Sequence, residues 1–136
     1  RIIFLLLIIS FGINGTIKLH PYEYAYYNSA VGGTSGAEGR FETDYWLTCY
    51  KEALQSFNEF APNGETLIIH REPRIATYYA AENTDIVELR GYSLKAGDYL
   101  LVSARLNARE IIERYSPDII SIKRDGATFC VIKEIQ

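Results

Sequence analysis

The stretch TLIIHREPRIATYYAAENTDIVELRGYSLKAGDYLLVS, residues 66–103, decides the fold. Its first apolar run, 66–70, is bounded by turn signals and therefore predicts a buried strand. Pro73 suits the first turn of a helix, and the apolar positions that follow carry this helix to Asn83. Two further apolar runs predict strands at 86–90 and 99–103. Strands that alternate with a helix are typical of a sheet with helices packed on it.

The chain after this stretch predicts one more helix and a closing hairpin. Asn107 can cap a helix that continues to Tyr115 and that Ser116-Pro117 ends. An Asp-Gly pair between two apolar runs is a strong hairpin signal, and here it separates the runs 119–123 and 128–135. The predicted fold class is α/β (α+β), with a mixed sheet of about five strands and two to three helices.

Before the deciding stretch, residues 43–60 predict an amphipathic helix. Its apolar residues recur every three or four positions: Trp46, Leu47, Tyr50, Ala53, Leu54, Phe57 and Phe60. Thr43 or Asp44 can cap this helix, and Asp44 is also favourable near the positive end of the helix dipole. The sequence Ala61-Pro62-Asn63-Gly64 ends it.

Residues 20–46 are rich in tyrosine and glycine and contain the only tryptophan of the chain. Glycines such as Gly32 and Gly33 can take positive φ or let another backbone approach closely. The tyrosines offer apolar rings with a polar tip. Two interpretations follow, a loop that closes over its own domain and a site built for a ligand. We expect Trp46 to be buried against the preceding tyrosines and the Gly32-Gly33 turn.

The same stretch resembles a known family. The order Tyr-Tyr-Asn, Gly-Gly and Asp-Tyr-Trp is similar to the segment after the last membrane span of bacterial multi-pass glycosyltransferases of the protein O-mannosyltransferase group (glycosyltransferase family 39, GT-C). Leu47 stands where a glycine often sits in that pattern. The residues that match are Tyr27, Asn28, Gly32, Gly33, Asp44, Tyr45 and Trp46.

The resemblance implies a non-catalytic C-terminal soluble domain of a membrane glycosyltransferase that uses lipid-phosphate-linked sugar. Such a domain covers the active site or helps to bind the acceptor. The family's catalytic acidic residue is expected in the first extracytoplasmic loop, so we assign no catalytic residue and no cofactor within this chain. The implied partners are the membrane, the transmembrane part of the same protein, and a lipid-linked sugar or glycan acceptor. The matched residues either face that acceptor, with Asp44 at the helix end, or only pack.

The chain opens with Arg1 and a nearly unbroken apolar run to residue 13. We interpret residues 1–13 as the end of a transmembrane helix that projects from the domain, and 14–136 as a single soluble extracytoplasmic domain. Two alternatives are the core of a signal peptide and a buried element of a soluble domain. The second function hypothesis is accordingly a self-contained secreted or membrane-anchored domain that binds carbohydrate or protein.

Composition limits the possible partners and sites. A net charge of −3 without a run of lysines or arginines argues against nucleic acid. Cys49 and Cys130 are far apart and outside any metal-binding spacing, so we expect two buried free thiols rather than a disulfide, and no metal site.

Only two weaker signals for chemistry remain. His70 ends an apolar strand, either bonded locally or placed at a ligand-binding sheet edge. Glu38, Glu42 and Asp44 form either a solvated loop or a small acidic group for a cation or a sugar hydroxyl.

Overall fold

A five-stranded mixed sheet lies at the centre of the computed structural model, which describes residues 1–105, 108–115 and 117–136 and only the backbone at positions 7, 8, 11 and 109. The strand order is β2-β1-β3-β5-β4. β1 runs parallel to both β2 and β3, while β5 runs antiparallel to β3 and β4. The strands are β1 (Thr66–Ile69), β2 (Asp85–Glu88), β3 (Tyr99–Ser103), β4 (Asp118–Arg124) and β5 (Ala127–Glu134). The predicted mixed sheet is thereby confirmed.

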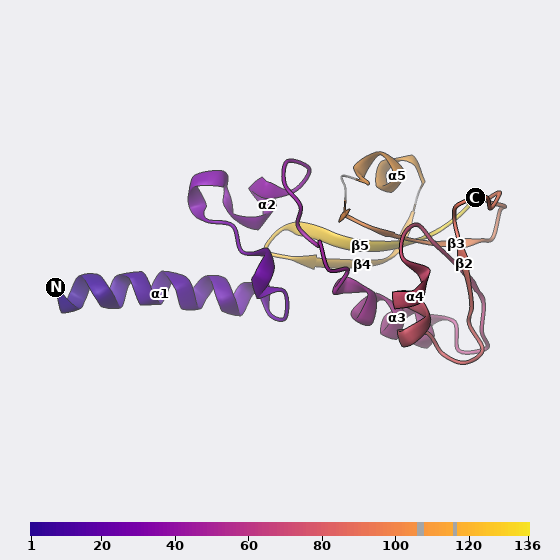
Figure 1. Ribbon diagram of the computed structural model, residues 1–136, viewed down its shortest axis with the longest axis horizontal. Helices are drawn as coiled ribbons and strands as arrows, with labels where there is room; N and C mark the ends of the chain where they lie inside the picture. The colour runs from indigo at the N-terminus through magenta and orange to yellow at the C-terminus, as the bar shows by residue number, and fades with distance from the viewer. Residues whose placement is uncertain (106–107, 116) are drawn as a thin grey trace.

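Helices cover both faces of this sheet, which explains why its central strands are apolar at nearly every position. Leu67 and Ile69 of β1 pack in the core cluster under α3 (Cys49–Phe60) and α4 (Pro73–Tyr79). Ile68, which alternates with them, packs in a second cluster under α5 (Arg109–Arg114). Figure 1 shows α3 and α4 on one side of the sheet and α5 on the other.

The hairpin between β4 and β5 turns where the Asp-Gly pair predicts it. Asp125 and Gly126 both have positive φ, at 48° and 80°. Two successive left-handed residues are what a two-residue hairpin turn requires. Local sequence therefore sets the register of these strands.

The helices are shorter than their apolar patterns predict. α3 begins at Cys49 instead of Thr43, because Leu47 takes φ 56° and interrupts helical geometry there. α4 ends at Tyr79 rather than Asn83. The predicted cap at Asn107 and the predicted end at Ser116 lie outside the described residues.

The apolar N-terminal segment forms a helix that projects away from the sheet, as expected (Figure 1). α1 (Ile2–Leu19) extends beyond residue 13, and its exposed large side chains are Ile2, Ile3, Phe4, Leu5, Leu6, Ile9, Ile13 and Ile17. Leu19, at its end, is buried. Among the described residues, no helix combines the length and the apolarity that crossing a membrane requires.

Between α1 and α3 the chain folds into short helical turns. These are η1 (Glu23–Ala25), η2 (Ser29–Val31) and α2 (Gly33–Ala37). Gly36 allows the tightest of the approaches here, because a Cβ on it would lie 2.2 Å from the carbonyl oxygen of Val31. Gly36 therefore serves close packing of the backbone within this segment.

The expectation of two free thiols is wrong. Cys49, at the start of α3, forms a disulfide with Cys130 of β5. Their Cα atoms are 5.9 Å apart, within the usual range for a disulfide. A sequence separation of 81 residues hid the pairing, since only the packing of α3 on β5 brings the two side chains together.

Candidate functional site

The carboxylate of Asp44 is fully buried and organises the entry to α3. Its Oδ1 accepts hydrogen bonds from the hydroxyl of Tyr24 and, at 2.9 Å, from the backbone N–H of Thr48. Its Oδ2 accepts a longer bond, 3.4 Å, from the backbone N–H of Cys49. Asp44 thus satisfies N–H groups at the start of α3 from five residues away instead of as an adjacent cap.

Burial raises the pKa of Asp44, and the bonds from Tyr24 and the backbone oppose this only in part. The same environment raises the pKa of Tyr24, first by burial and then through its bond to Asp44. A carboxyl group with a raised pKa is a candidate acid in a catalytic site. Here both carboxylate oxygens of Asp44 accept hydrogen bonds from its own chain. These contacts indicate a structural role, which is to hold the start of α3.

A second set of contacts attaches the stretch after α1 to the domain. The hydroxyl of Tyr22 donates to Glu52 Oε2 over 3.0 Å, and the guanidinium of Arg124 pairs with the same oxygen at 2.7 Å. Arg124 also lies over the Tyr22 ring, with 5.2 Å from Cζ to the ring centroid, and donates from Nε to the carbonyl of His20. These contacts fix the segment that directly follows α1 to α3 and β4.

The matched residues of the glycine-rich loop bond mainly within the loop. Tyr27 donates its hydroxyl to the Glu42 carbonyl over 2.8 Å and stacks on Phe41. Asn28 Oδ1 accepts a hydrogen bond of 3.0 Å from the backbone N–H of Ala30 within the same loop. Gly32 and Gly33 have φ of 88° and 70°, which ordinary L-residues adopt only with strain.

Trp46 is exposed, and the expectation that it is buried against the tyrosines and the Gly32-Gly33 turn is wrong. Its side chain is 69% exposed and meets the Tyr45 ring edge-on, with the ring centroids 5.0 Å apart. On Tyr45 lies the guanidinium of Arg105, 4.8 Å from the ring centroid. We call Tyr45 and Trp46 the aromatic platform. It consists of two exposed rings that stand edge-on to each other, at residues that match the glycosyltransferase pattern.

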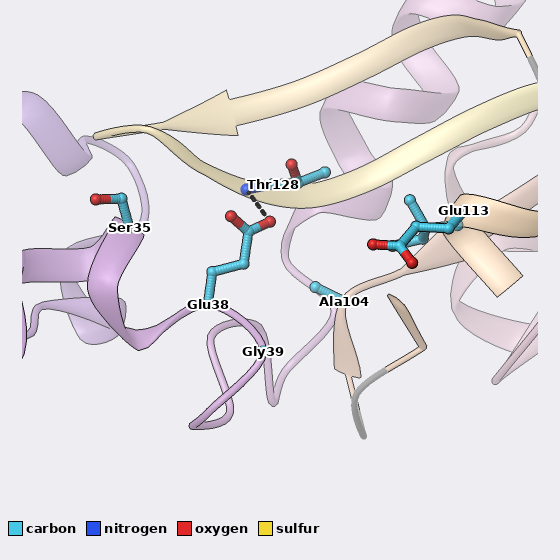
Figure 2. A pocket seen from close by; sticks show the side chains of 7 residues that line it. Ser35, Glu38, Gly39, Ala104, Glu113 and Thr128 are labelled. Carbon is cyan, nitrogen blue, oxygen red and sulfur yellow. Dashed lines mark hydrogen bonds between the residues drawn. The ribbon is translucent and has the colours of Figure 1, made fainter. Parts of the chain in front are cut away.

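A pocket of about 300 Å³ opens on the α5 face, between α2, α5 and β5 (Figure 2). Glu38 reaches into it from the end of α2 and accepts a hydrogen bond of 2.9 Å from the backbone N–H of Thr128. Glu113 enters from α5 on the other side (Figure 2). The remaining lining residues are Ser35, Gly39, Ala104 and Ile112. Sequence spacing offers no signal for this pair of carboxylates, because only the fold brings Glu38 and Glu113 to opposite sides of one pocket.

Of the two interpretations of Glu38, Glu42 and Asp44, a small acidic group of all three does not form in the described residues. Glu38 lines the pocket, whereas Asp44 is buried at the start of α3. The described residues bring Asp44 close to only two other potential metal ligands, the sulfurs of Cys49 and Cys130. Those sulfurs are bonded to each other, so this group is a disulfide beside a carboxylate and not a metal centre.

His70 lies directly after β1, at the carboxyl edge of the parallel strands. Its backbone N–H donates to the Leu101 carbonyl over 3.0 Å, while its ring Nδ1 is buried without a described partner. Burial, and then the charge of Arg71, lower the pKa of His70. Strand alternation places His70 on the same face as Ile68.

No protein-family model, curated protein or solved structure matches this chain. The geometry of its own residues therefore carries the functional argument.

Proposed function

We propose that this chain is the non-catalytic, extracytoplasmic C-terminal domain of a membrane glycosyltransferase that uses lipid-phosphate-linked sugar, and that its aromatic platform contacts the saccharide acceptor. The observation that carries the proposal is the exposed Trp46 held edge-on to Tyr45. Flat aromatic surfaces with polar edges suit the alternating apolar and hydroxyl faces of sugar rings. Both residues belong to the motif that resembles the family.

Two further features support the location of the domain. A disulfide between Cys49 and Cys130 suits an oxidising compartment, which the cytoplasm is not. The exposed apolar side chains of α1 suit lipid or the apolar surface of a transmembrane part, with α1 as the end of a membrane helix. Together they favour a domain held at the outer side of a membrane.

The fluorescence of the single tryptophan tests this proposal directly, because Trp46 is the only such reporter in the chain. The full chain in nanodiscs is titrated with neutral mono- to tetrasaccharides, and emission and acrylamide quenching are recorded. We expect a blue shift and protection from quenching with at least one saccharide. If no saccharide changes the emission, while transfer from detergent to nanodiscs does, Trp46 is a lipid contact and the acceptor role is wrong.

The aromatic platform equally supports a second candidate, a self-contained membrane-anchored carbohydrate-binding domain. The coding sequence upstream of the Arg1 codon separates the two. Multiple apolar spans there support the glycosyltransferase, and a start codon close to Arg1 supports the self-contained domain.

A further inference from the structure

The carboxyl ends of β1 and β3 form a corner of the sheet where the chain diverges. The two strands are parallel neighbours, with Ile69 opposite Leu101. After β1 the chain crosses to α4 on one face, whereas after β3 it leads to α5 on the opposite face (Figure 1). Such a divergence between adjacent parallel strands is where open α/β sheets bind their ligands.

Tyr50 holds the two strand ends together at this corner. Its buried hydroxyl donates to the carbonyl of Arg71 over 2.6 Å, and the side chain of Ser103 lies beside the same hydroxyl. Burial is the main cause that raises the pKa of Tyr50, and the charge of Asp44 adds to it. Arg105, two residues after β3, lies over the ring of Tyr45, which places the aromatic platform beside the end of β3.

Two arginines leave the corner from its two strands. Arg71 follows β1, and Arg105 follows β3 and lies over the Tyr45 ring at 4.8 Å. The Nε of each guanidinium is buried and has no hydrogen-bond partner among the described residues. Within that part of the chain neither arginine forms an ion pair, although other arginines do. Both side chains are half-exposed, so their outer nitrogens are open to solvent while each Nε–H is a buried donor without an acceptor. An unsatisfied buried donor on a cation is costly, and an anion that accepts from it would remove that cost.

Asp44 and Glu72, whose charges act on Tyr50, form no ion pair with either arginine among the described residues. The oxygens of Asp44 accept hydrogen bonds from Tyr24, Thr48 and Cys49. Glu72 is close enough for its charge to act on Tyr50, but its side chain is exposed.

We propose that Arg71 and Arg105 bind an oxyanion, a phosphate or a carboxylate, on a saccharide whose ring packs on Trp46. Guanidinium groups match both anions through paired N–H donors. The saccharide part of this inference rests on the proposed function, whereas the oxyanion part rests on the two arginines alone. The ligand class is therefore a phosphorylated or carboxylated sugar.

Isothermal titration of the full chain in nanodiscs tests the proposal with four probes: inorganic phosphate, glucose 6-phosphate, glucuronate and glucose. We expect the charged sugars to bind at least tenfold more tightly than glucose. If phosphate and glucose 6-phosphate bind and glucuronate does not, the site is specific for phosphate, and the reverse result makes it a carboxylate site. If none of the three anions binds more tightly than glucose, the proposal is wrong.

Variants locate the site. Arg71→Gln and Arg105→Gln should each weaken binding of the charged sugar at least tenfold, and Arg90→Gln, an exposed arginine after β2, should leave it unchanged. Equal loss in all three indicates general charge attraction and overturns the site. Should Arg105→Gln fail to fold, Arg105→Lys keeps the charge and should lose part of the affinity, since lysine lacks the paired donors. Unchanged affinity in Arg105→Lys and Arg71→Gln also overturns it.

The two proposals fail separately. Neutral saccharides that still protect Trp46 from quenching in Arg71→Gln leave the proposed acceptor contact intact, whatever the anions do. If phosphate binds the native chain but no saccharide changes the emission of Trp46, the oxyanion site stands and the saccharide part of the proposal is wrong.

Discussion

At the scale of single residues, Asp44 is predicted as an adjacent helix cap, and in the fold it bonds to the start of α3 from five residues earlier in the chain. Because its carboxylate bonds to the helix start, the chain between them turns outward and exposes Tyr45 and Trp46. The backbone N–H groups at the start of α3 are satisfied at the same time. One buried carboxylate therefore both begins the helix and presents the aromatic platform.

Asp44→Asn should alter the pH dependence of stability. The folded-state pKa of Asp44 is raised, so the folded protein holds its proton more tightly than the unfolded chain. The stability of the native chain relative to Asp44→Asn should therefore fall as the pH rises from the unfolded value of 3.8 through the folded pKa, and then level off. Urea midpoints of both proteins from pH 3 to 7 measure this difference. A difference that grows with pH contradicts the assignment.

Leu47 combines a buried side chain with a backbone angle that suits glycine. It is 1% exposed and has φ 56°. Glycine normally costs about 0.5–1 kcal/mol relative to alanine, but a left-handed residue reverses that order by about 1 kcal/mol. Leu47→Gly should therefore be at least as stable as Leu47→Ala. Both variants should be less stable than the native chain, because each leaves a cavity in the core. Thermal unfolding of the pair decides it, and a clearly weaker Leu47→Gly would show that φ carries no strain.

Trp46→Ala should hardly change the unfolding free energy, by about 0.5 kcal/mol at most, because the ring is exposed. This replaces the loss of roughly 3–5 kcal/mol that a buried tryptophan would imply. Phe57→Ala is the matched control, since Phe57 is fully buried on α3 and should show that large loss. Similar urea midpoints for the two variants would contradict the exposed position of Trp46.

At the scale of elements, α1 divides into a free part and a held part. Leu19 is buried, and a Cβ on Gly15 would lie 2.6 Å from the Tyr26 ring, so the last turns belong to the domain. The turns nearer the N-terminus lie away from the sheet (Figure 1), and their described large side chains, from Ile2 to Ile9, are exposed. A cut at residue 13 should therefore separate the two parts.

Deletion of residues 1–13 should make the chain soluble without detergent and leave its unfolding midpoint unchanged. The described side chains of residues 1–13 are exposed, so the deletion removes apolar surface from solvent and takes no described side chain out of the core. Gel filtration and thermal unfolding in matched buffers measure both effects. A larger deletion through Leu19 is the control and should lower the midpoint. Unfolding of 14–136 would mean that α1 supports the core.

At the scale of the whole molecule, the features lie at separate places: an apolar helix at one end, and a pocket and a cationic corner on the sheet. The full chain alone should transfer no sugar from lipid-phosphate donors, because the family it resembles is expected to keep its catalytic acid in another loop. Radiolabelled donor in nanodiscs, with and without acceptor, measures turnover. Activity above the blank that Glu38→Gln or Glu113→Gln abolishes would instead make the pocket a catalytic site.

The sequence by itself determined the parts of this protein that depend on neighbours along the chain. The apolar runs predict each strand, because side-chain alternation and burial act within a few residues, and the Asp125-Gly126 turn predicts the hairpin. The projecting helix follows from apolarity on all its sides. Helix ends were less predictable, since one left-handed residue, Leu47, overrides an apolar pattern that continues through it.

Only the tertiary structure decided what distant residues do together. The disulfide, the pocket between Glu38 and Glu113, and the corner of Arg71 and Arg105 join positions that no spacing rule connects. Exposure of Trp46 was decided in the same way, because a turn held by the buried Asp44 directs the ring outward. Periodicity along the sequence indicates which residues suit burial. The packing of α3 on β5 decides which of them are buried, and Tyr45 and Trp46, which remain exposed, form the aromatic platform.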